Sequence, residues 1–397
     1  MKRTTVLKSA AVLGALSLTL AACGGSSETA ASSAAPAASS AAPSAAASEA
    51  AVTAACKIGT MLPQTGNLAF LGPPEFAGVD LAVAQINAAG GVLGSPLENL
   101  VGDSGDTSTD IASQTADSHI AAGVSAIIGA ASSGVSLTVI DKITGAGVIH
   151  FSPANTSPTL SDYADNGLYF RTAPSDLFQG AVLGSLMLDA GVENAGILAM
   201  DDSYGTGLAD ALESNFTAGG GTVSAKVIYN PQAAEFSAEV GKLKASKPGA
   251  IAVIGFEESV KIVQELIKQG IGPDKVPLYL VDGNLSQQAF AELPKGIMVG
   301  TKGTLPGAAA SSQFQGELLT VNPDLTDYSY APEAYDTVNL IALGMEVAKS
   351  CDGAAIAAAL QSVSKDGEYC TDFASCKALN DAGTDFNYEG VSGPVEF

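Results

Sequence analysis

The chain has 397 residues, a formal net charge of −23 and a hydrophobic share of 47%. This negative charge argues against nucleic acid or an anionic lipid surface as the partner, because both would repel it. About 340 residues follow Cys56, which is more than one core comfortably holds, so we expect two domains in that part of the chain.

Residues 1–22 have the layout of a secretion signal peptide. Basic residues precede an apolar stretch over residues 10–20, and this stretch is too short for a permanent membrane span. The sequence LAAC at residues 20–23 resembles the lipobox of bacterial lipoproteins, which implies that Cys23 is the lipid attachment site. We therefore expect an exported, extracytoplasmic protein that is anchored to the cell membrane through lipid on Cys23.

The segment that follows the signal, residues 23–55, consists almost entirely of Ala, Ser and Pro. Nothing in it is large enough to build a core, and its prolines interrupt helices, so we expect a flexible linker. An alanine-rich helix is the alternative, because alanine is the best helix former.

Four cysteines remain after Cys23, and an even number is typical of disulfides in an oxidising compartment. Three pairings are possible. The short TDFAS segment favours a bond between Cys370 and Cys376, which leaves Cys56 with Cys351 by elimination. Metal ligation is disfavoured, since no CxxC pair or neighbouring histidine accompanies these residues.

After residue 56, short apolar runs alternate with amphipathic segments of helix length. Such runs are typical of buried parallel strands, and the alternation predicts βαβ units and a doubly wound α/β fold. The expected strands lie within residues 57–62, 124–132, 147–155, 195–202, 250–258, 277–283 and 296–303. The expected helices cover residues 75–88, 111–122, 178–190, 236–245 and 260–269.

The sequence contains few motifs or residues that suggest catalysis. It contains no GxxxxGK[ST] loop, HExxH motif or GxSxG motif, and neither His119 nor His150 is placed as a base. The acidic residues near 103–110 miss the spacing of a calcium loop, so we expect residues 106–110 to supply a helix N-cap instead. We therefore expect no enzyme activity, no metal and no cofactor.

The loops after the expected strands carry groups that suit a small polar ligand, and ligands of open α/β sheets bind at such loops. Ser132, Ser133 and Thr156 lie in loops that lead into helices, so their hydroxyl and amide groups suit a carboxylate. Glu258, at the end of an apolar strand, needs a positive partner such as a ligand ammonium. A zwitterion satisfies both demands. The alternative is that the hydroxyls cap helices and Glu258 is a solvated surface acid.

Five blocks of sequence resemble one known family. In order they are GTMLPQTGNLAFLG…EFAGVDLAVAQINAAGGVLG, AIIGAASS, SPANTSP, DDSYGTG and YAPEAYDTVNLIALGM. From about residue 56 onward, the chain resembles the leucine/isoleucine/valine-type substrate-binding proteins of ABC importers. The resemblance implies the type I periplasmic-binding-protein fold, in which two Rossmann-like α/β lobes joined by a hinge close on a ligand in the cleft. It also implies an ABC transporter permease as the partner.

On the first lobe, the resemblance implies ligand contacts at four positions. The hydroxyl and amide of Ser133 match groups that bind the ligand carboxylate, and the Ala154 carbonyl matches an acceptor for the ammonium. Thr156 matches a residue that touches the polar end of the ligand, and Phe70 falls in a loop that meets its tail. A cysteine pair often found in this lobe is absent, with Ser132 at the place of one member.

On the second lobe, the resemblance implies that Tyr204 covers the ligand and that Glu258 pairs with its ammonium. The loop around Glu258 is about one residue shorter than the family pattern, so Glu257 is the alternative for that role. Asp282 belongs to the same set of ligand-binding candidates and is expected at a crossing between the lobes.

These observations lead to one main functional hypothesis. We expect a first lobe of residues 56–173 and 284–397, and a second lobe of residues 174–283. The protein would capture an amino acid or a similar small polar solute and deliver it to an ABC transporter permease. The alternative is a ligand-sensing module of the same fold that signals to a regulatory partner.

Overall fold

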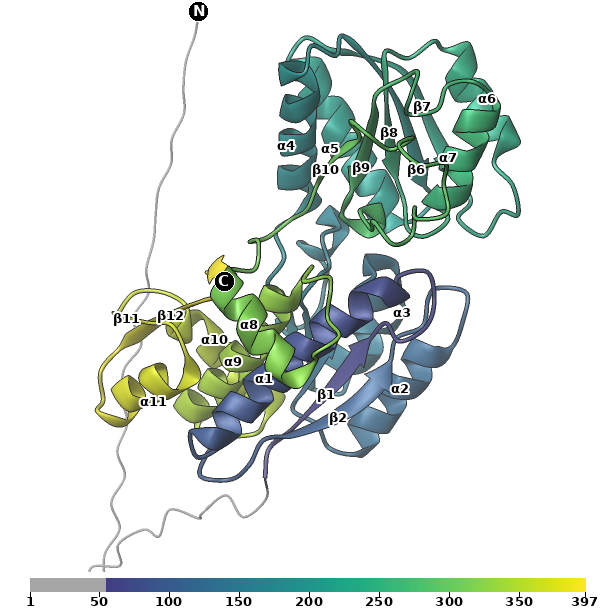
Figure 1. Ribbon diagram of the computed structural model, residues 1–397. Helices are drawn as coiled ribbons and strands as arrows, with labels where there is room; N and C mark the ends of the chain where they lie inside the picture. The colour runs from purple at the N-terminus through teal and green to yellow at the C-terminus, as the bar shows by residue number, and fades with distance from the viewer. Residues whose placement is uncertain (1–54) are drawn as a thin grey trace, which may run out of the picture. The chain divides into compact units, whose positions relative to one another are not determined.

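A computed structural model describes residues 55–397 of the chain (Figure 1). The signal peptide, the Cys23 lipid attachment site and the linker up to residue 54 lie outside the described residues. The described part contains two α/β lobes, each built on a parallel five-stranded sheet, and a small third sheet near the C-terminus. This architecture confirms the α/β prediction.

The first lobe is built on a sheet with the strand order β2-β1-β3-β4-β5, in which all pairs are parallel. Neighbouring residues of β3 point to opposite faces, so Ile127 and Ile128 belong to two different hydrophobic clusters. Both faces are therefore covered, which is why the central strands read as unbroken apolar runs. The elements are β1 Lys57–Leu62, η1 Ala69–Leu71, α1 Gly72–Ala88, β2 Glu98–Asp103, α2 Ile111–Ala121, β3 Ala126–Gly129, α3 Ser133–Gly145, β4 Ile149–Ser152, η2 Pro158–Leu160 and β5 Tyr169–Arg171.

The second lobe has the strand order β10-β9-β8-β6-β7, and its pairs are also parallel. Its central strand β8 is buried along its whole length. The elements are α4 Asp176–Asp189, β6 Asn194–Met200, α5 Ser203–Ala218, β7 Thr222–Tyr229, α6 Ser237–Ala245, β8 Ala250–Ile254, α7 Ser259–Lys268, β9 Leu278–Val281, η3 Asp282–Asn284 and β10 Lys302–Thr304.

After β10 the chain returns to the first lobe. Helix α9 packs along α1, and the close approach requires Gly78, because a Cβ there would lie 2.4 Å from the Ala331 carbonyl oxygen. Near the C-terminus, the Phe397 ring packs against Phe151 and Phe170 of the first sheet, at centroid distances of 5.6 and 5.3 Å. The elements are α8 Ser312–Val321, α9 Ala331–Ala348, α10 Gly353–Val363, β11 Glu368–Cys370, α11 Phe373–Asp381, β12 Phe386–Gly390 and β13 Gly393–Pro394.

The prediction of a strand over residues 296–303 is wrong for most of that range, because only Lys302–Thr304 forms a strand. Gly296 and Gly300 both have positive φ, which suits the turns found there, and Val299 is 80% exposed. Strand β10 also lies beyond residue 283, where we expected the second lobe to end. The five expected helices, in contrast, lie within one helical turn of their expected bounds.

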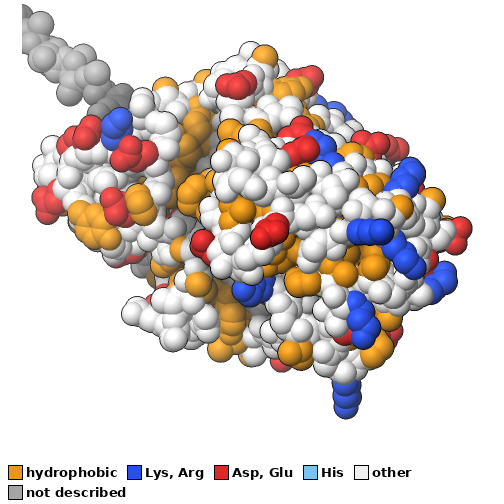
Figure 2. All heavy atoms as spheres, turned by 90° about the horizontal axis from the view of Figure 1, so that it is seen from above, with side chains coloured by type: hydrophobic (Ala, Val, Ile, Leu, Met, Phe, Trp, Pro, Cys, Tyr) orange, Lys and Arg blue, Asp and Glu red, His pale blue; other side chains and the backbone are white. Residues whose placement is uncertain are grey.

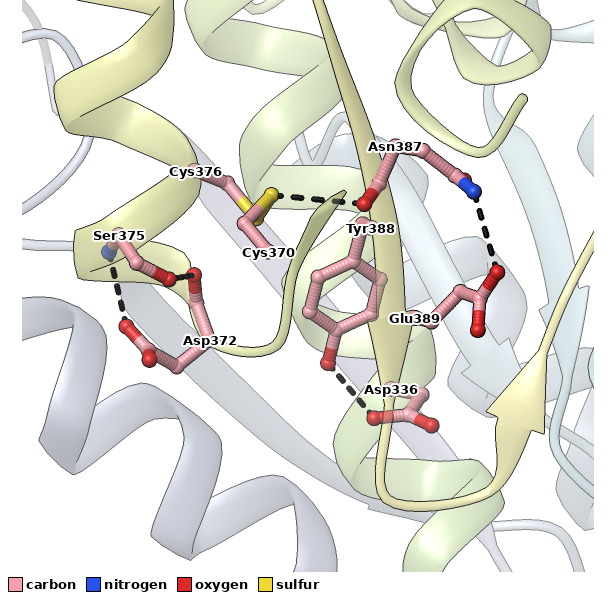
Figure 3. The surroundings of a disulfide bond; sticks show 8 residues. All are labelled: Asp336, Cys370, Asp372, Ser375, Cys376, Asn387, Tyr388 and Glu389. Atoms are coloured by element: carbon pink, nitrogen blue, oxygen red, sulfur yellow. Dashed lines mark hydrogen bonds between the residues drawn. A yellow bond between two sulfur atoms is a disulfide. The ribbon is translucent and has the colours of Figure 1, made fainter. Parts of the chain in front are cut away.

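Both favoured disulfides are present in the structure. The Cys56–Cys351 bond joins the residue before β1 to the segment after α9, across 295 residues of sequence. The Cys370–Cys376 bond joins β11 to α11 (Figure 3). Beside it, the Tyr388 hydroxyl donates to Asp336 at 2.6 Å, and Asp372 caps α11 by accepting from the Ser375 amide at 2.8 Å. These contacts tie the third sheet to α9 and α11.

The surface of the described residues carries charges of both signs. On the face shown in Figure 2, acidic and basic side chains are interspersed with hydrophobic ones. Exposed hydrophobic side chains include those of Leu177 and Phe178 on α4, which are 60% and 64% exposed. No helix within residues 55–397 has the length and apolar character needed to cross a membrane.

The buried carboxyl group of Glu333 lies where the chain passes between the lobes. Glu333, in the first turn of α9, accepts a hydrogen bond from the Ala308 amide at 3.2 Å, and its carbonyl oxygen accepts one from the Thr172 hydroxyl at 3.1 Å. Thr172 and Ala308 belong to the two segments that connect the sheets, so Glu333 holds both connections. Burial raises the pKa of Glu333 to about 8. Burial, with the Glu333 charge, also raises the pKa of Glu75 well above its usual range.

A pH dependence of stability follows from the raised pKa of Glu333. The folded state binds this proton more tightly than the unfolded state, whose carboxyl has the ordinary value of 4.5, so the free energy of unfolding falls as pH rises from about 4.5 to about 8. The slope for one such group approaches about 1.4 kcal/mol per pH unit. Glu333→Gln should flatten the pH dependence of the free energy of unfolding in urea titrations between pH 5 and pH 8.

The matched control is Glu292→Gln, which changes an exposed carboxyl of the second lobe. Its stability should follow the wild-type curve over the same pH range. If the Glu333→Gln curve also ran parallel to that of the wild type, Glu333 would not be the group that takes up the proton on folding.

Candidate functional site

A small cavity lies between the carboxyl ends of the two main sheets. Its volume is about 10 Å³. The first lobe supplies residues from the loops after β1, β3 and β4, and the second lobe supplies residues from the loops after β6, β8 and β9. The lining residues are Leu68, Leu71, Ala131, Ser132, Ser133, Ala154, Thr156, Tyr204, Phe256, Asp282, Gly283 and Tyr330. This is the location that open α/β sheets use for ligands.

The first-lobe side of the cavity is rich in hydrogen-bond donors. Ser132 is the N-cap of α3, and its hydroxyl accepts from the Val135 amide at 3.3 Å. The Ser133 hydroxyl accepts from the amides of Thr156 and Ser157, both at 3.3 Å, and so joins the loop after β3 to the loop after β4. Hydroxyl groups at the positive end of a helix form an environment that stabilises an anion such as a carboxylate.

The second-lobe side of the cavity presents the carboxylate of Asp282, which follows β9. Its Oδ1 accepts from Gln179 Nε2 at 2.9 Å and from the Tyr204 hydroxyl at 2.8 Å, and its Oδ2 accepts from the Tyr330 hydroxyl at 2.8 Å. Burial raises the pKa of Asp282, and the three hydrogen bonds oppose that rise. Because all three donors are neutral, this charge has no cationic hydrogen-bond partner among the described residues, which favours a positively charged group beside it.

Two other buried acids belong to the second lobe near the site, and their surroundings disfavour their charged forms. Burial and the Asp282 charge raise the pKa of Asp176, while Thr156 and Arg171 lower it. Asp202 caps α5 by accepting from the Gly205 amide at 2.7 Å, and burial raises its pKa to about 6. The second-lobe side of the site therefore disfavours further anions.

Apolar side chains form the rest of the cavity wall. Leu68 precedes η1 and Leu71 is its last residue, and they are 4% and 2% exposed. Phe256, after β8, stacks on Tyr204 with a ring-centroid distance of 5.3 Å and an interplanar angle of 15°. The site therefore combines a donor-rich side, an acidic side and an apolar wall.

Five of the expected ligand contacts line this one cavity, namely Ser133, Ala154, Thr156, Tyr204 and Asp282. Phe70 instead lines a neighbouring open cavity of about 920 Å³, together with residues of the 285–301 segment. Phe256, Leu68, Leu71 and Tyr330 were not among the expected contacts. All but Phe256 lie within the blocks that resemble the family, but nothing in those blocks marked them as ligand contacts.

Glu258 does not line the cavity, although it is buried. Its Oε1 accepts from the Tyr229 hydroxyl at 2.7 Å and from the Phe256 amide at 2.9 Å. Glu258 therefore stabilises the loop after β8 without reaching the cavity. Glu257 is exposed. The structure therefore makes Asp282, rather than either glutamate, the carboxylate that faces Ser133 across the cavity.

Neither histidine lies at the cavity. His119 Nε2 contacts the Thr60 carbonyl oxygen at 2.9 Å, and burial lowers the pKa of His150 to about 4, so His150 is neutral at physiological pH. Asp106 accepts from the Ser108 amide at 2.9 Å, but the N-cap of α2 is Asp110, whose side chain makes no capping bond. Residues 55–397 contain no cluster of His, Cys, Asp or Glu arranged to hold a metal ion.

The two lobes and the cavity at their strand ends define a two-lobed solute-binding protein. The family model named "Periplasmic binding protein" matches residues 55–382, and the chain belongs to this family. This family consists of solute-binding receptors rather than enzymes, and it indicates an extracytoplasmic location.

Individual relatives agree with this assignment. The "Chemotactic signal transduction system substrate-binding protein BasB" of Halobacterium salinarum is 29% identical over 85% of this chain and 82% of its own. The "Leu/Ile/Val-binding protein homolog 2" of Brucella abortus is 29% identical over 70% of this chain and 73% of its own. A solved type 1 periplasmic binding protein from Bordetella pertussis superposes with a TM-score of 0.70 at 25% identity, over 79% of this chain and 90% of that one.

The contacts of Glu258 lead to a prediction about stability. Glu258→Ala would leave the Phe256 amide without an acceptor and the Tyr229 hydroxyl with only the Ile254 carbonyl oxygen, 3.2 Å away, at a cost of about 1–3 kcal/mol. We expect a clear fall in the midpoint of urea unfolding for Glu258→Ala and almost none for Glu257→Ala, which alters the exposed neighbour. Equal midpoints for the two variants would contradict a structural role for Glu258.

Proposed function

We propose that this protein is a lipid-anchored extracytoplasmic receptor that binds an α-amino acid with an apolar side chain and delivers it to an ABC transporter permease. The observation that carries the proposal is the arrangement of Ser133 and Asp282 on opposite lobes of one cavity. A molecule with a carboxylate at one end of its polar head and an ammonium at the other would bridge these residues.

Ser133 and Thr156 would hold the ligand carboxylate with their hydroxyl groups, near the N-terminus of α3. Asp282 would pair with the ammonium, and the Ala154 carbonyl would accept a second hydrogen bond from it. Asp282 is favoured over Glu258 for this role because it lines the cavity, whereas Glu258 does not. The hydrogen-bond donors around Asp282 are all neutral. A carboxylate in such surroundings gains from a cationic partner.

The ligand tail would lie against Leu68, Leu71 and Phe256. These side chains offer no hydrogen bonds, so they favour an aliphatic or aromatic tail over a polar one. The name of the Brucella relative, a Leu/Ile/Val-binding protein, supports the same class of ligand.

Ligand entry would require the two lobes to move apart. A cavity of about 10 Å³ holds about one water molecule, which is far smaller than an amino acid. The connecting segments near Thr172 and Ala308 would form the hinge. We propose lobe boundaries that follow the sheets, with the second lobe extending through β10. Ligand that touches both lobes would stabilise their joined arrangement.

Membrane attachment and the permease partner complete the proposal. The lipobox-like LAAC sequence supports lipidation of Cys23, and residues 23–55 would serve as the tether. A receptor that serves a membrane transporter must remain near it. The negative net charge of −23 makes nucleic acid an unfavourable partner.

A second candidate function is ligand sensing, in which the loaded receptor signals to a regulatory partner. The observation that favours it is the similarity to BasB, whose name places that protein in a chemotactic signal transduction system. The two candidates are separated by purifying the lipidated protein from membranes. Co-purification of a permease supports delivery of the ligand, whereas co-purification of a regulatory partner without a permease supports sensing.

The ligand class is tested by calorimetry with L-leucine and its des-amino analogue, 4-methylpentanoate. Asp282→Asn should weaken L-leucine binding by about 2–5 kcal/mol, since it removes one partner of a buried charge pair. The same variant should leave the weaker binding of 4-methylpentanoate nearly unchanged, because that molecule has no ammonium.

The matched control is Glu258→Gln, which neutralises a buried acid of the same lobe outside the cavity. It should retain most of the affinity for L-leucine. If Glu258→Gln lost much of the affinity for L-leucine and Asp282→Asn lost none, Glu258 rather than Asp282 would be the partner of the ligand ammonium. If the wild-type protein binds no amino acid at millimolar concentration, the proposed ligand class is wrong.

A further inference from the structure

The side chain of Tyr330 connects the two lobes at the candidate site. Tyr330 directly precedes α9, which packs on α1 of the first lobe, whereas Asp282 follows β9 of the second sheet. The Tyr330 hydroxyl donates to Oδ2 of Asp282 at 2.8 Å. The two residues are 2% and 6% exposed. This hydrogen bond therefore crosses between the lobes in a nearly dry environment, where such bonds to a charge are strong.

The backbone of Tyr330 supports a special role. Its φ of 59° and ψ of 5° place a bulky residue in the left-handed region, which side chains with a Cβ rarely adopt. The conformation is held on both sides, because the Ala331 amide donates to the Tyr328 carbonyl and the Ala334 amide donates to the Tyr330 carbonyl. Strained residues of this kind persist where the surrounding structure fixes them, and they concentrate at ligand clamps and switch regions.

Two other contacts between the lobes join neutral groups. The Ser157 hydroxyl donates to the Ser203 carbonyl at 2.9 Å, and the Glu257 amide approaches the Asn67 carbonyl at 3.4 Å. These contacts would be broken by lobe separation without any effect on a charge in the cavity. The Tyr330 bond differs, since its acceptor is a carboxylate that lines the cavity.

Tyr204 provides an internal comparison for Tyr330. Its hydroxyl also donates to Asp282 at 2.8 Å, but it comes from α5 of the second lobe and therefore moves with Asp282. Burial raises the pKa of both tyrosines well above the usual range, so both hydroxyls remain protonated donors at physiological pH. The two side chains thus supply the same chemistry to one carboxylate, from opposite sides of the hinge.

We propose that Tyr330 is a positioning residue that couples ligand recognition at Asp282 to the joining of the lobes. In the joined arrangement, its hydroxyl orients Asp282 toward the cavity. When the lobes separate, Asp282 loses this donor and gains water, so its attraction for a ligand ammonium falls. The part of this inference that concerns the ligand rests on the proposed function, whereas the link between the lobes does not.

The first test measures backbone amide hydrogen exchange in the full-length protein without added ligand. Tyr330→Phe keeps the aromatic ring and removes only the hydroxyl. It should raise exchange rates about tenfold in peptides that cover the cavity loops of both lobes, near residues 131–136 and 203–208. Tyr204→Phe removes an equivalent donor and should change exchange only within the second lobe. Equal patterns in the two variants would overturn the coupling.

The second test measures the dissociation of L-leucine by stopped flow. Tyr330→Phe should speed dissociation about tenfold, while Ser157→Ala, which removes a lobe contact away from Asp282, should change it about twofold or less. Unchanged dissociation in Tyr330→Phe would overturn the ligand part of the inference. Failure of wild type to bind L-leucine, with the expected exchange patterns, would reject the amino-acid ligand and support the coupling between the lobes.

If Tyr330→Phe is too unstable to measure, the variant Asp282→Asn tests the same hydrogen bond. Asp282→Asn keeps the shape of the acceptor and removes its charge, so it weakens the same bond from the other side. Its exchange pattern should resemble that expected for Tyr330→Phe, with faster exchange in the cavity loops of both lobes. Faster exchange in the second lobe alone would contradict the inference.

Discussion

The buried carboxylate of Asp282 is the interaction on which the candidate site depends. It lies where the second sheet ends, and it accepts hydrogen bonds from Gln179 of α4, Tyr204 of α5 and Tyr330, which directly precedes α9. Those donors remove much of the cost of burying the charge without neutralising it. The remaining negative potential gives the cavity its polarity, and the donors around Ser133 supply the complementary end. The apolar core of each lobe serves to hold these two ends in fixed positions.

Much of the fold could be predicted from the sequence because parallel strands that are covered on both faces must be apolar throughout. Strands β1, β3, β4, β6, β8 and β9 were found in this way. The edge strands β2 and β7 were not expected, since each has exposed residues along its length and lacks a continuous apolar run. The run over residues 296–303 was misleading for the opposite reason, because it is apolar but lies in turns at the surface.

The site was only partly accessible to sequence reasoning. Ser133, Ala154 and Thr156 follow adjacent strands of one sheet, so their proximity follows from strand order. The choice between Glu258 and Asp282 could not be made in this way, since both follow buried strands and only the direction of the side chain separates them. Tyr330 begins the YAPEAYDTVNLIALGM block, but nothing in that block indicated a contact with Asp282. The position of Tyr330 depends on a left-handed backbone that tyrosine rarely adopts, and on a contact with a residue 48 positions away in sequence.

The bond between Cys56 and Cys351 has a mechanical consequence. Strand β1 begins at Lys57, and it lies in the first sheet between β2 and β3. A force that pulled on the chain ahead of residue 56 would otherwise act on β1 directly and tend to peel it from the sheet. The disulfide transfers that load to the segment after α9, a helix that is buried along most of its length. Such a force would divide at Cys56 between β1 and the segment after α9, and would not act on the hydrogen bonds of a single strand alone.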